Sequence, residues 1–181
     1  PAALAKRSDV PRTMEEPALG FALRVPAGWD LERRETPGQT VWRIENPVRV
    51  GPDLLTVVVA LVERTPGKDA VESLQELARE WATKLKDGKV TEFGPFRMGA
   101  MAGLSVRLSG VQEESDVAPV AVSAIGLQFE AGERRLMVVA IAPAASAAML
   151  DAIGQPGAIL GPSETPRTDR PPPPADAAKQ N

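Results

Sequence analysis

The segment from Leu54 to Val62, LLTVVVALV, is the longest apolar run in the chain and constrains its fold most strongly. It is rich in β-branched residues, which favour extended backbone. A strand that is apolar on both sides predicts a central position in a sheet, covered by other structure on each face. The run is interrupted by Thr56 and is far shorter than the ~20 apolar residues that cross a bilayer as a helix. We therefore expect a sheet with a layer on each face and no membrane-spanning segment.

Further strands are predicted before and after this segment. Phe21, Leu23 and Val25 alternate with smaller or polar residues, and residues 40–46 alternate in the same way until a proline interrupts them. Four more segments with strand character are separated by glycine-containing turns: Val90–Met98, Leu104–Val111, Val120–Phe129 and Leu136–Ile141. Consecutive strands joined by short turns predict antiparallel pairing.

One long helix is predicted over residues 69–86. Asp69 and Glu72 match a capping box at its start, and two lysines and Gly88 provide a cationic last turn and a stop signal. A single apolar stripe repeats at helical spacing, consisting of Val71, Leu74, Ala78, Trp81 and Leu85.

A short helix is predicted at Ala144–Ile153, ended by Gly154. The order of strands, long helix, strands and short helix predicts an α+β fold. In this fold a central antiparallel sheet carries both helices, which makes an α/β/α sandwich.

The chain is predicted to hold one domain, at residues 20–157. Residues 1–19 are polar and predict an extended or partly disordered lead-in. Residues 158–181 predict a disordered proline-rich tail, with four consecutive prolines at 171–174. We interpret the tail as a solvated spacer, with a proline-rich ligand for an aromatic groove as the alternative.

The composition excludes most catalytic chemistry. The chain has no cysteine, histidine or tyrosine, so disulfides, thiolate nucleophiles, imidazole acid–base catalysis and the usual zinc or copper ligands are excluded. Its net charge is −3 and its basic residues are scattered, which argues against nucleic acid as a partner. We therefore expect no enzyme activity and no cofactor.

Short motifs that suggest ligand chemistry have simpler structural interpretations. Gly67-Lys68 lacks the rest of a phosphate-binding loop, and Gly99–Gly103 lacks the third glycine and the helix of a dinucleotide site. The carboxylates of residues 113–116 match no calcium loop and predict a charged hairpin tip. Ser105, Ser109 and Ser123 lack a nucleophile elbow.

Several segments, in this order and spacing, resemble the PsbP-like superfamily. They are FALRVPAGW at 21–29, the helix at 69–86, GLSVRLSG at 103–110, and LQFEAGERRLMVVAI at 127–141. The superfamily includes photosystem extrinsic subunits, a Ran-binding import factor, bacterial and mycobacterial lipoproteins, and chaperones of secretion effectors. The resemblance covers roughly residues 19–155. It implies a sheet with helices on its faces and a non-catalytic binding or assembly role, and it transfers no individual functional residue.

The leading hypothesis is a non-catalytic bacterial accessory protein that binds and stabilises another protein or an assembly. The chain begins at Pro1 rather than at methionine, which fits removal of a leader but leaves its presence open, and the low-complexity tail and the resemblance point the same way. An extracytoplasmic location is therefore expected, with a cytoplasmic one as the alternative. A lipid anchor in the precursor and the oligomeric state are left open.

Two alternative functions remain at this stage. The protein could be a cytosolic chaperone for an apolar segment of a secreted effector, or it could bind a small apolar ligand between the helix and the sheet. As partner-binding candidates we select Trp42, Arg43 and Arg49, because an aromatic and guanidinium groups near Pro47 fit an interrupted sheet edge. Trp29, in contrast, is expected to be buried at a corner of the core.

Overall fold

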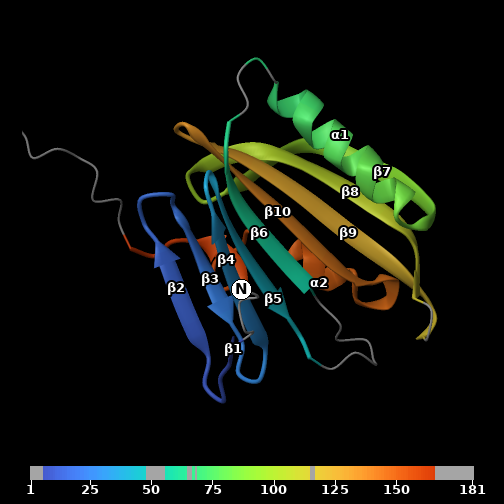
Figure 1. Cartoon of the computed structure of the whole chain (residues 1–181), viewed down its shortest axis with the longest axis horizontal. Coiled ribbons are helices and arrows are strands. Elements are labelled where there is room, and N and C mark those ends of the chain that lie inside the picture. The colour runs from blue at the N-terminus through green and yellow to red at the C-terminus, as the bar shows by residue number, and fades with distance from the viewer. Residues whose placement is uncertain (1–5, 48–55, 65–66, 68, 115–116, 166–181) are drawn as a thin grey trace, which may run out of the picture.

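The computed structural model describes residues 6–47, 56–64, 67, 69–114 and 117–165 (Figure 1). Two helices are present in these ranges, α1 (Ala70–Thr83) and α2 (Ala148–Asp151), and a 3-10 turn at Ala144–Ser146 precedes α2. The strands of the larger sheet are β1 (Lys6–Arg7), β4 (Asp30–Thr36), β5 (Gln39–Glu45), β6 (Thr56–Glu63), β7 (Lys86–Met98), β8 (Met101–Glu114), β9 (Val117–Ala131) and β10 (Arg134–Pro143). The strands of the smaller sheet are β2 (Arg12–Glu16), β3 (Phe21–Val25) and β11 (Leu160–Pro162).

All neighbouring strands pair antiparallel. The larger sheet has eight strands in the order β1-β4-β5-β6-β10-β9-β8-β7, and the smaller has three in the order β11-β3-β2. The strands β7, β8, β9 and β10 form consecutive hairpins, whereas β6 and β7 are separated in the sheet by three strands. Helix α1 lies in the connection between β6 and β7 and carries the chain across one face of the sheet.

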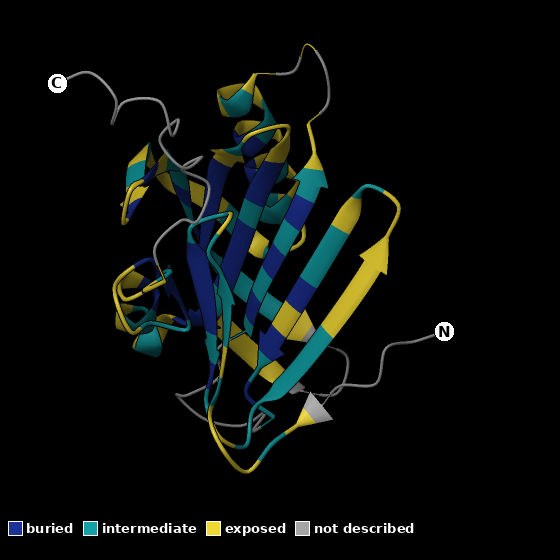
Figure 2. Ribbon diagram, turned by 90° about the vertical axis from the view of Figure 1, so that its left-hand side faces the viewer, coloured by how far each residue is buried: buried dark blue, intermediate teal, exposed yellow. Residues whose placement is uncertain are grey.

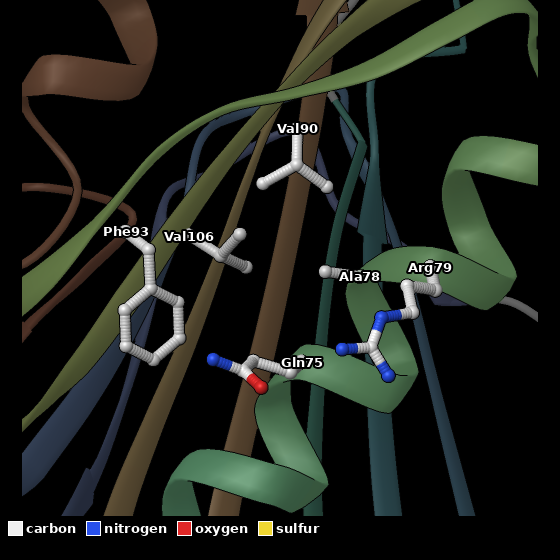
Figure 3. Close-up of a pocket in the computed structure, with 6 residues that line it drawn as sticks. All are labelled: Gln75, Ala78, Arg79, Val90, Phe93 and Val106. Carbon is white, nitrogen blue, oxygen red and sulfur yellow. The ribbon is translucent and has the colours of Figure 1, made fainter.

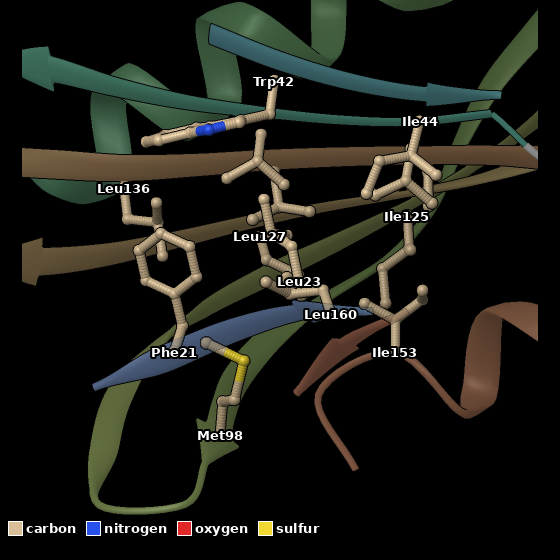
Figure 4. Close-up of a cluster of buried hydrophobic side chains, with 14 of the residues drawn as sticks. Phe21, Leu23, Trp42, Ile44, Met98, Ile125, Leu127, Leu136, Ile153 and Leu160 are labelled. Carbon is tan, nitrogen blue, oxygen red and sulfur yellow. The ribbon is translucent and has the colours of Figure 1, made fainter. Parts of the chain in front are cut away.

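The main core lies between the two sheets (Figure 4). The register aligns Trp42, Val59, Val138 and Leu127 across four neighbouring strands, and all four side chains are buried. Opposite this row, β3 contributes Phe21, Leu23 and Val25, and further apolar side chains come from α2 and β11. Alternation along each strand therefore places one set of side chains in a dry layer between the sheets.

Helix α1 covers part of the opposite face of the larger sheet, over β7, β8 and β9. Leu74 and Ala78 of the helix pack on Val106, Leu108 and Ala124 of the sheet. This second, smaller core explains the helical spacing of the apolar residues, because only one side of α1 is turned toward the sheet.

Polar contacts fix the first turn of α1 on the sheet. The buried Gln128 side chain donates a hydrogen bond to the carbonyl of Ala70 at 2.9 Å. The buried Arg135 donates to Ser73 Oγ at 2.7 Å and to Glu130 Oε1 at 3.1 Å. Because a buried guanidinium needs partners, this network favours one placement of the helix over others.

The predicted α+β class and antiparallel sheet are confirmed. One of the two covering layers differs from the prediction, because it is mainly a second sheet rather than a helix. Both faces of the sheet are covered at least in part, but the face opposite α1 packs mainly against β2, β3 and β11, with α2 beside them. Residues of the predicted lead-in and tail form β2 and β11. Leu160 is fully buried, so the fold extends beyond the expected boundary at residue 157.

Helix α1 ends at Thr83, three residues before the predicted end, and no lysine lies in its last turn. Asp69 is the N-cap, as expected, and its side chain accepts from Val71 N. Val71 itself is exposed rather than part of the buried stripe. The inward row of Phe21, Leu23 and Val25 is confirmed, and Trp29 is partly buried against the main core.

Some predictions lie on residues outside the described ranges. These include Leu54 and Leu55 of the central strand, the tip of the 113–116 loop, and the four prolines of the tail. In the part that the structure describes, no helix is long and apolar enough to cross a membrane.

Candidate functional site

A groove lies between α1 and the edge of the larger sheet (Figure 3). It encloses a cavity of about 220 Å³, lined by Gln75, Ala78, Arg79, Val90, Phe93 and Val106. The first three residues come from α1, Val90 and Phe93 come from β7, and Val106 comes from β8. We call this feature the α1–β7 groove.

The local sequence explains why apolar side chains enter this groove. The register pairs Phe93 with Val106 and Val90 with Leu108, so all four side chains lie on the sheet face that carries α1. Val106 and Leu108 are covered by the helix, whereas Val90 and Phe93 on the outer strand are 46% and 38% exposed. Because β7 is the edge strand and no further described strand lies beside it, the outer wall of the groove is left open to solvent.

Exposed apolar side chains are concentrated at this groove. Among the described residues, five large hydrophobic side chains are exposed, at Val10, Val71, Val90, Phe93 and Val120. Two of them line the groove, and Val71 lies one helical turn before Gln75 on the same side of α1. A cluster of this kind marks an interaction surface more often than single exposed side chains do.

The helix side of the groove is polar and carries a positive charge. Figure 3 shows the Gln75 amide directed toward Phe93 and the Arg79 guanidinium on the helix side of the groove. Arg79 makes no ion pair within the described ranges, and none of the groove-lining residues is acidic. The chain as a whole has a net charge of −3, so this surface differs in sign from the average of the protein.

The free edge of β7 is poorly suited to accept a further strand. Its pairing with β8 contains two irregularities, between Lys86 and Lys89 and between Val90 and Glu92. Pro95 lies within the strand and provides no backbone N–H. Bulges, prolines and lysines are the features that block edge-to-edge pairing. A partner at this groove would therefore be held by side-chain contacts rather than by strand addition.

A second apolar surface lies on the same sheet face, beyond the helix. The register carries the row under α1 onward to Met137, Ala60 and Val41, and Val58 and Val62 lie beside them on β6. All five are half-buried, and Figure 2 shows such residues alternating with buried ones along the central strands. Among the described elements, no helix packs over this β5–β6 strip.

The three predicted partner-binding residues do not form one site. Trp42 is 3% exposed and packs edge-to-face on Phe21 in the main core. The strand β5 pairs with β4 on one side and with β6 on the other, so the expected interrupted edge is absent. The prediction that Trp42 lies at a sheet edge is therefore wrong. Arg43 is exposed on the opposite face of β5 and pairs with Glu45 at 3.1 Å. Arg49 lies outside the described residues.

The ionisable groups with shifted pKa values belong to surface ion pairs away from the groove. A hydrogen bond from Arg7 lowers the pKa of Asp30, and two contacts of 2.9 Å make this pair bidentate and join β1 to β4. A hydrogen bond to Glu113 raises the pKa of Lys86 where β7 begins. In the described ranges, no group of three or more acidic, histidine or cysteine side chains is placed to hold a metal ion.

Comparison with known proteins identifies neither a family nor a function. No family model matches the chain, and no curated protein matches it. Among solved structures, a Pseudomonas aeruginosa protein of unknown function aligns with a TM-score of 0.44 and 8% identity, over 78% of this chain and 88% of that chain.

A Bacteroides thetaiotaomicron protein aligns with a TM-score of 0.41 and 14% identity, over 75% of this chain and 42% of that chain. Similarity at this level assigns no family. The resemblance to the PsbP-like superfamily therefore stays a prediction from the sequence.

Proposed function

We propose that this protein is a non-catalytic accessory protein that binds another protein through the α1–β7 groove. The observation that carries the proposal is the exposure of Val90 and Phe93 at a cavity, with Val71 one helical turn away and with Arg79, which makes no ion pair in the described part of the chain, at its rim. Apolar side chains surrounding a small hollow, with an arginine at its rim, have the composition of a protein interface centre. The lack of cysteine, histidine and tyrosine supports a binding role over a catalytic one.

The size of the groove also favours a protein partner over a free small molecule. Its cavity of about 220 Å³ is below the ~300–1,000 Å³ typical of small-molecule sites. One or two side chains of a partner would fill it. Native mass spectrometry of the purified protein should accordingly show the mass of the bare chain, and a retained apolar ligand would contradict this choice.

A crosslinking experiment tests the proposed surface. A photoreactive benzoylphenylalanine is introduced at Phe93, and a matched variant carries it at Val10, which is the most exposed large apolar residue described and does not line the groove. In the native host, Phe93 should give a crosslink to a defined protein that Val10 does not give. That protein is then purified, and its binding should be lost with Phe93→Ser and retained with Val10→Ser. Equal crosslinking from both positions, or full binding by Phe93→Ser, would refute the assignment.

A second candidate function is a chaperone for an apolar segment of a secreted effector. The observation that favours it is the β5–β6 strip, where Val41, Val58, Ala60, Val62 and Met137 are partly accessible on an apolar sheet face. Replacing Val58 by aspartate should abolish copurification of an apolar effector segment under this function. If the α1–β7 groove is the binding surface instead, Val58→Asp should leave the crosslink from position 93 unchanged.

The extracytoplasmic location is part of the proposal and depends on the sequence alone. Cell fractionation of the native host tests it. Recovery of the protein with periplasmic or envelope markers would support export, whereas recovery with cytoplasmic enzymes would favour the chaperone function in the cytosol.

A further inference from the structure

We propose that the α1–β7 groove selects a polypeptide segment in which a bulky apolar side chain is adjacent to a carboxylate. This inference rests on the proposed function and names the chemistry of the partner. The apolar side chain would fill the cavity against Val90, Phe93 and Val106. The carboxylate would pair with the guanidinium of Arg79 on the opposite wall.

The argument for the apolar side chain starts from the shape of the cavity. Ala78 has a small side chain on the inner side of α1, and it leaves space above Val106 that the longer Gln75 and Arg79 border. The floor is apolar and buried, since Val106 and Ala78 are 2% and 3% exposed. An incoming side chain would therefore exchange water for apolar contacts on several sides.

The argument for the carboxylate comes from charge complementarity. Arg79 has no ion-pair partner in the described ranges, whereas Lys84, the C-cap of the helix, pairs with Glu80 at 2.8 Å. The groove-lining residues include no acid. Arg97 on β7 is exposed, and it lies on the same sheet face as Phe93 because residues four positions apart along a strand point to the same side. An arginine at the rim recognises a carboxylate through a planar pair of hydrogen bonds.

The binding mode follows from the edge of β7. Strand addition is disfavoured by Pro95 and by the two irregularities of pairing. The recognised feature is therefore a pair of neighbouring side chains, one apolar and one acidic. A basic residue in place of the acid would face Arg79 and be repelled. The charge of Arg79 therefore both attracts acidic segments and excludes basic ones.

A peptide array provides the test with defined probes. Each peptide has ten residues and carries leucine, phenylalanine or tryptophan at its centre, followed by aspartate or, in the matched set, by lysine. We expect the wild-type protein to bind the aspartate set about two- to fivefold more tightly, as one partly exposed ion pair allows. Hits are measured again in solution by fluorescence polarisation at low and high salt, and the preference should shrink at high salt.

Variants separate the two contributions. Arg79→Glu should reverse the preference toward the lysine set, and Phe93→Ser should remove binding of both sets. Arg134→Glu is the matched control, because Arg134 is an exposed arginine at the start of β10 that does not line the groove. It should leave the preference unchanged. Circular dichroism and the melting temperature establish that each variant is folded.

The outcomes distinguish the two levels of the proposal. If Phe93→Ser removes binding but Arg79→Glu leaves the preference unchanged, the groove binds a protein segment and the acidic specificity is refuted. If no peptide binds and the Phe93 crosslink is also absent, the proposed function itself fails. If a fatty acid carboxylate copurifies and is released by Phe93→Ser, the occupant is a small amphiphile and the polypeptide assignment is refuted.

Discussion

Truncation of Trp42 to alanine should destabilise the protein strongly. The indole is 3% exposed, its ring contacts Phe21 edge-to-face with centroids 6.0 Å apart, and the guanidinium carbon of Arg33 lies 5.9 Å from its ring centre. Removing a buried tryptophan costs about 3–5 kcal/mol, because the transfer free energy is lost and a cavity remains between two sheets. The edge-to-face contact contributes about 0.5–1.5 kcal/mol of its own. We expect a loss near the middle of the truncation range, about 4 kcal/mol.

This loss can be measured as a shift of the thermal transition. For a chain of this size, each kcal/mol lowers the melting temperature by about 2–4 °C, so Trp42→Ala should melt about 8–16 °C below the wild type. Calorimetry and urea unfolding followed by circular dichroism give independent values. Neither method depends on the fluorescence of the tryptophan that is removed.

A neighbouring exposed residue provides the control. Arg43 is 51% exposed on the opposite face of β5 and pairs with Glu45. A surface pair of this kind contributes about 0–1 kcal/mol, so Arg43→Ala should shift the melting temperature by less than about 4 °C. If Trp42→Ala instead melted within this margin and weakened partner binding, Trp42 would be a binding residue, and its assignment to the core would be wrong.

Three further predictions concern local structure. Gly126→Ala should cost about 1–3 kcal/mol in urea unfolding, because a Cβ there would lie 2.9 Å from a methyl of Val106 under α1. Asp87 has a φ of 54°, so Asp87→Val should lose about 1–2 kcal/mol, whereas Asp87→Asn should retain wild-type stability. The hydrogen bond from Arg7 lowers the pKa of Asp30, so this pair stabilises the fold above about pH 4, and the benefit is lost as the pH falls through the folded-state pKa. Asp30→Asn should therefore lower the melting temperature at pH 7 and converge with the wild type as the pH falls below the folded-state pKa; a difference that does not change with pH would exclude the pair as its cause.

The elements with clear periodicity could be predicted from the sequence, and those without it could not. Strand β3 and the long hairpins alternate because one side of each strand packs into the core. Strand β4, with the sequence DLERRET, shows no such alternation, since much of it lies exposed near the edge of the sheet. Its pairing with β5 is a long-range property. Strands β2 and β11 are short and are recognisable only from their pairing with β3.

The candidate site was harder to predict, because exposure depends on which part of the sheet α1 covers. A sequence pattern indicated the burial of Trp42, because Trp42 and Ile44 alternate onto one side of β5, and both are buried. No sequence pattern indicated the exposure of Phe93. Its segment places Val90 and Phe93 three residues apart, so strict alternation would put them on opposite faces. Their shared, exposed position follows from the place of β7 at the sheet edge and from the irregular pairing between Val90 and Glu92.

The connection between α1 and β7 makes the groove rigid, which is the property that a selective binding site requires. The helix ends at Thr83 and the strand begins at Lys86, so the two walls of the groove are joined almost directly. Gly88, the third residue of β7, is required next to this connection, because a Cβ there would lie 2.0 Å from the carbonyl oxygen of Ala82. At the other end of the helix, hydrogen bonds from Gln128 and Arg135 hold the first turn of α1 to the sheet. Fixed at both ends, α1 can keep the groove open without a bound partner, so association would not require ordering of the groove walls.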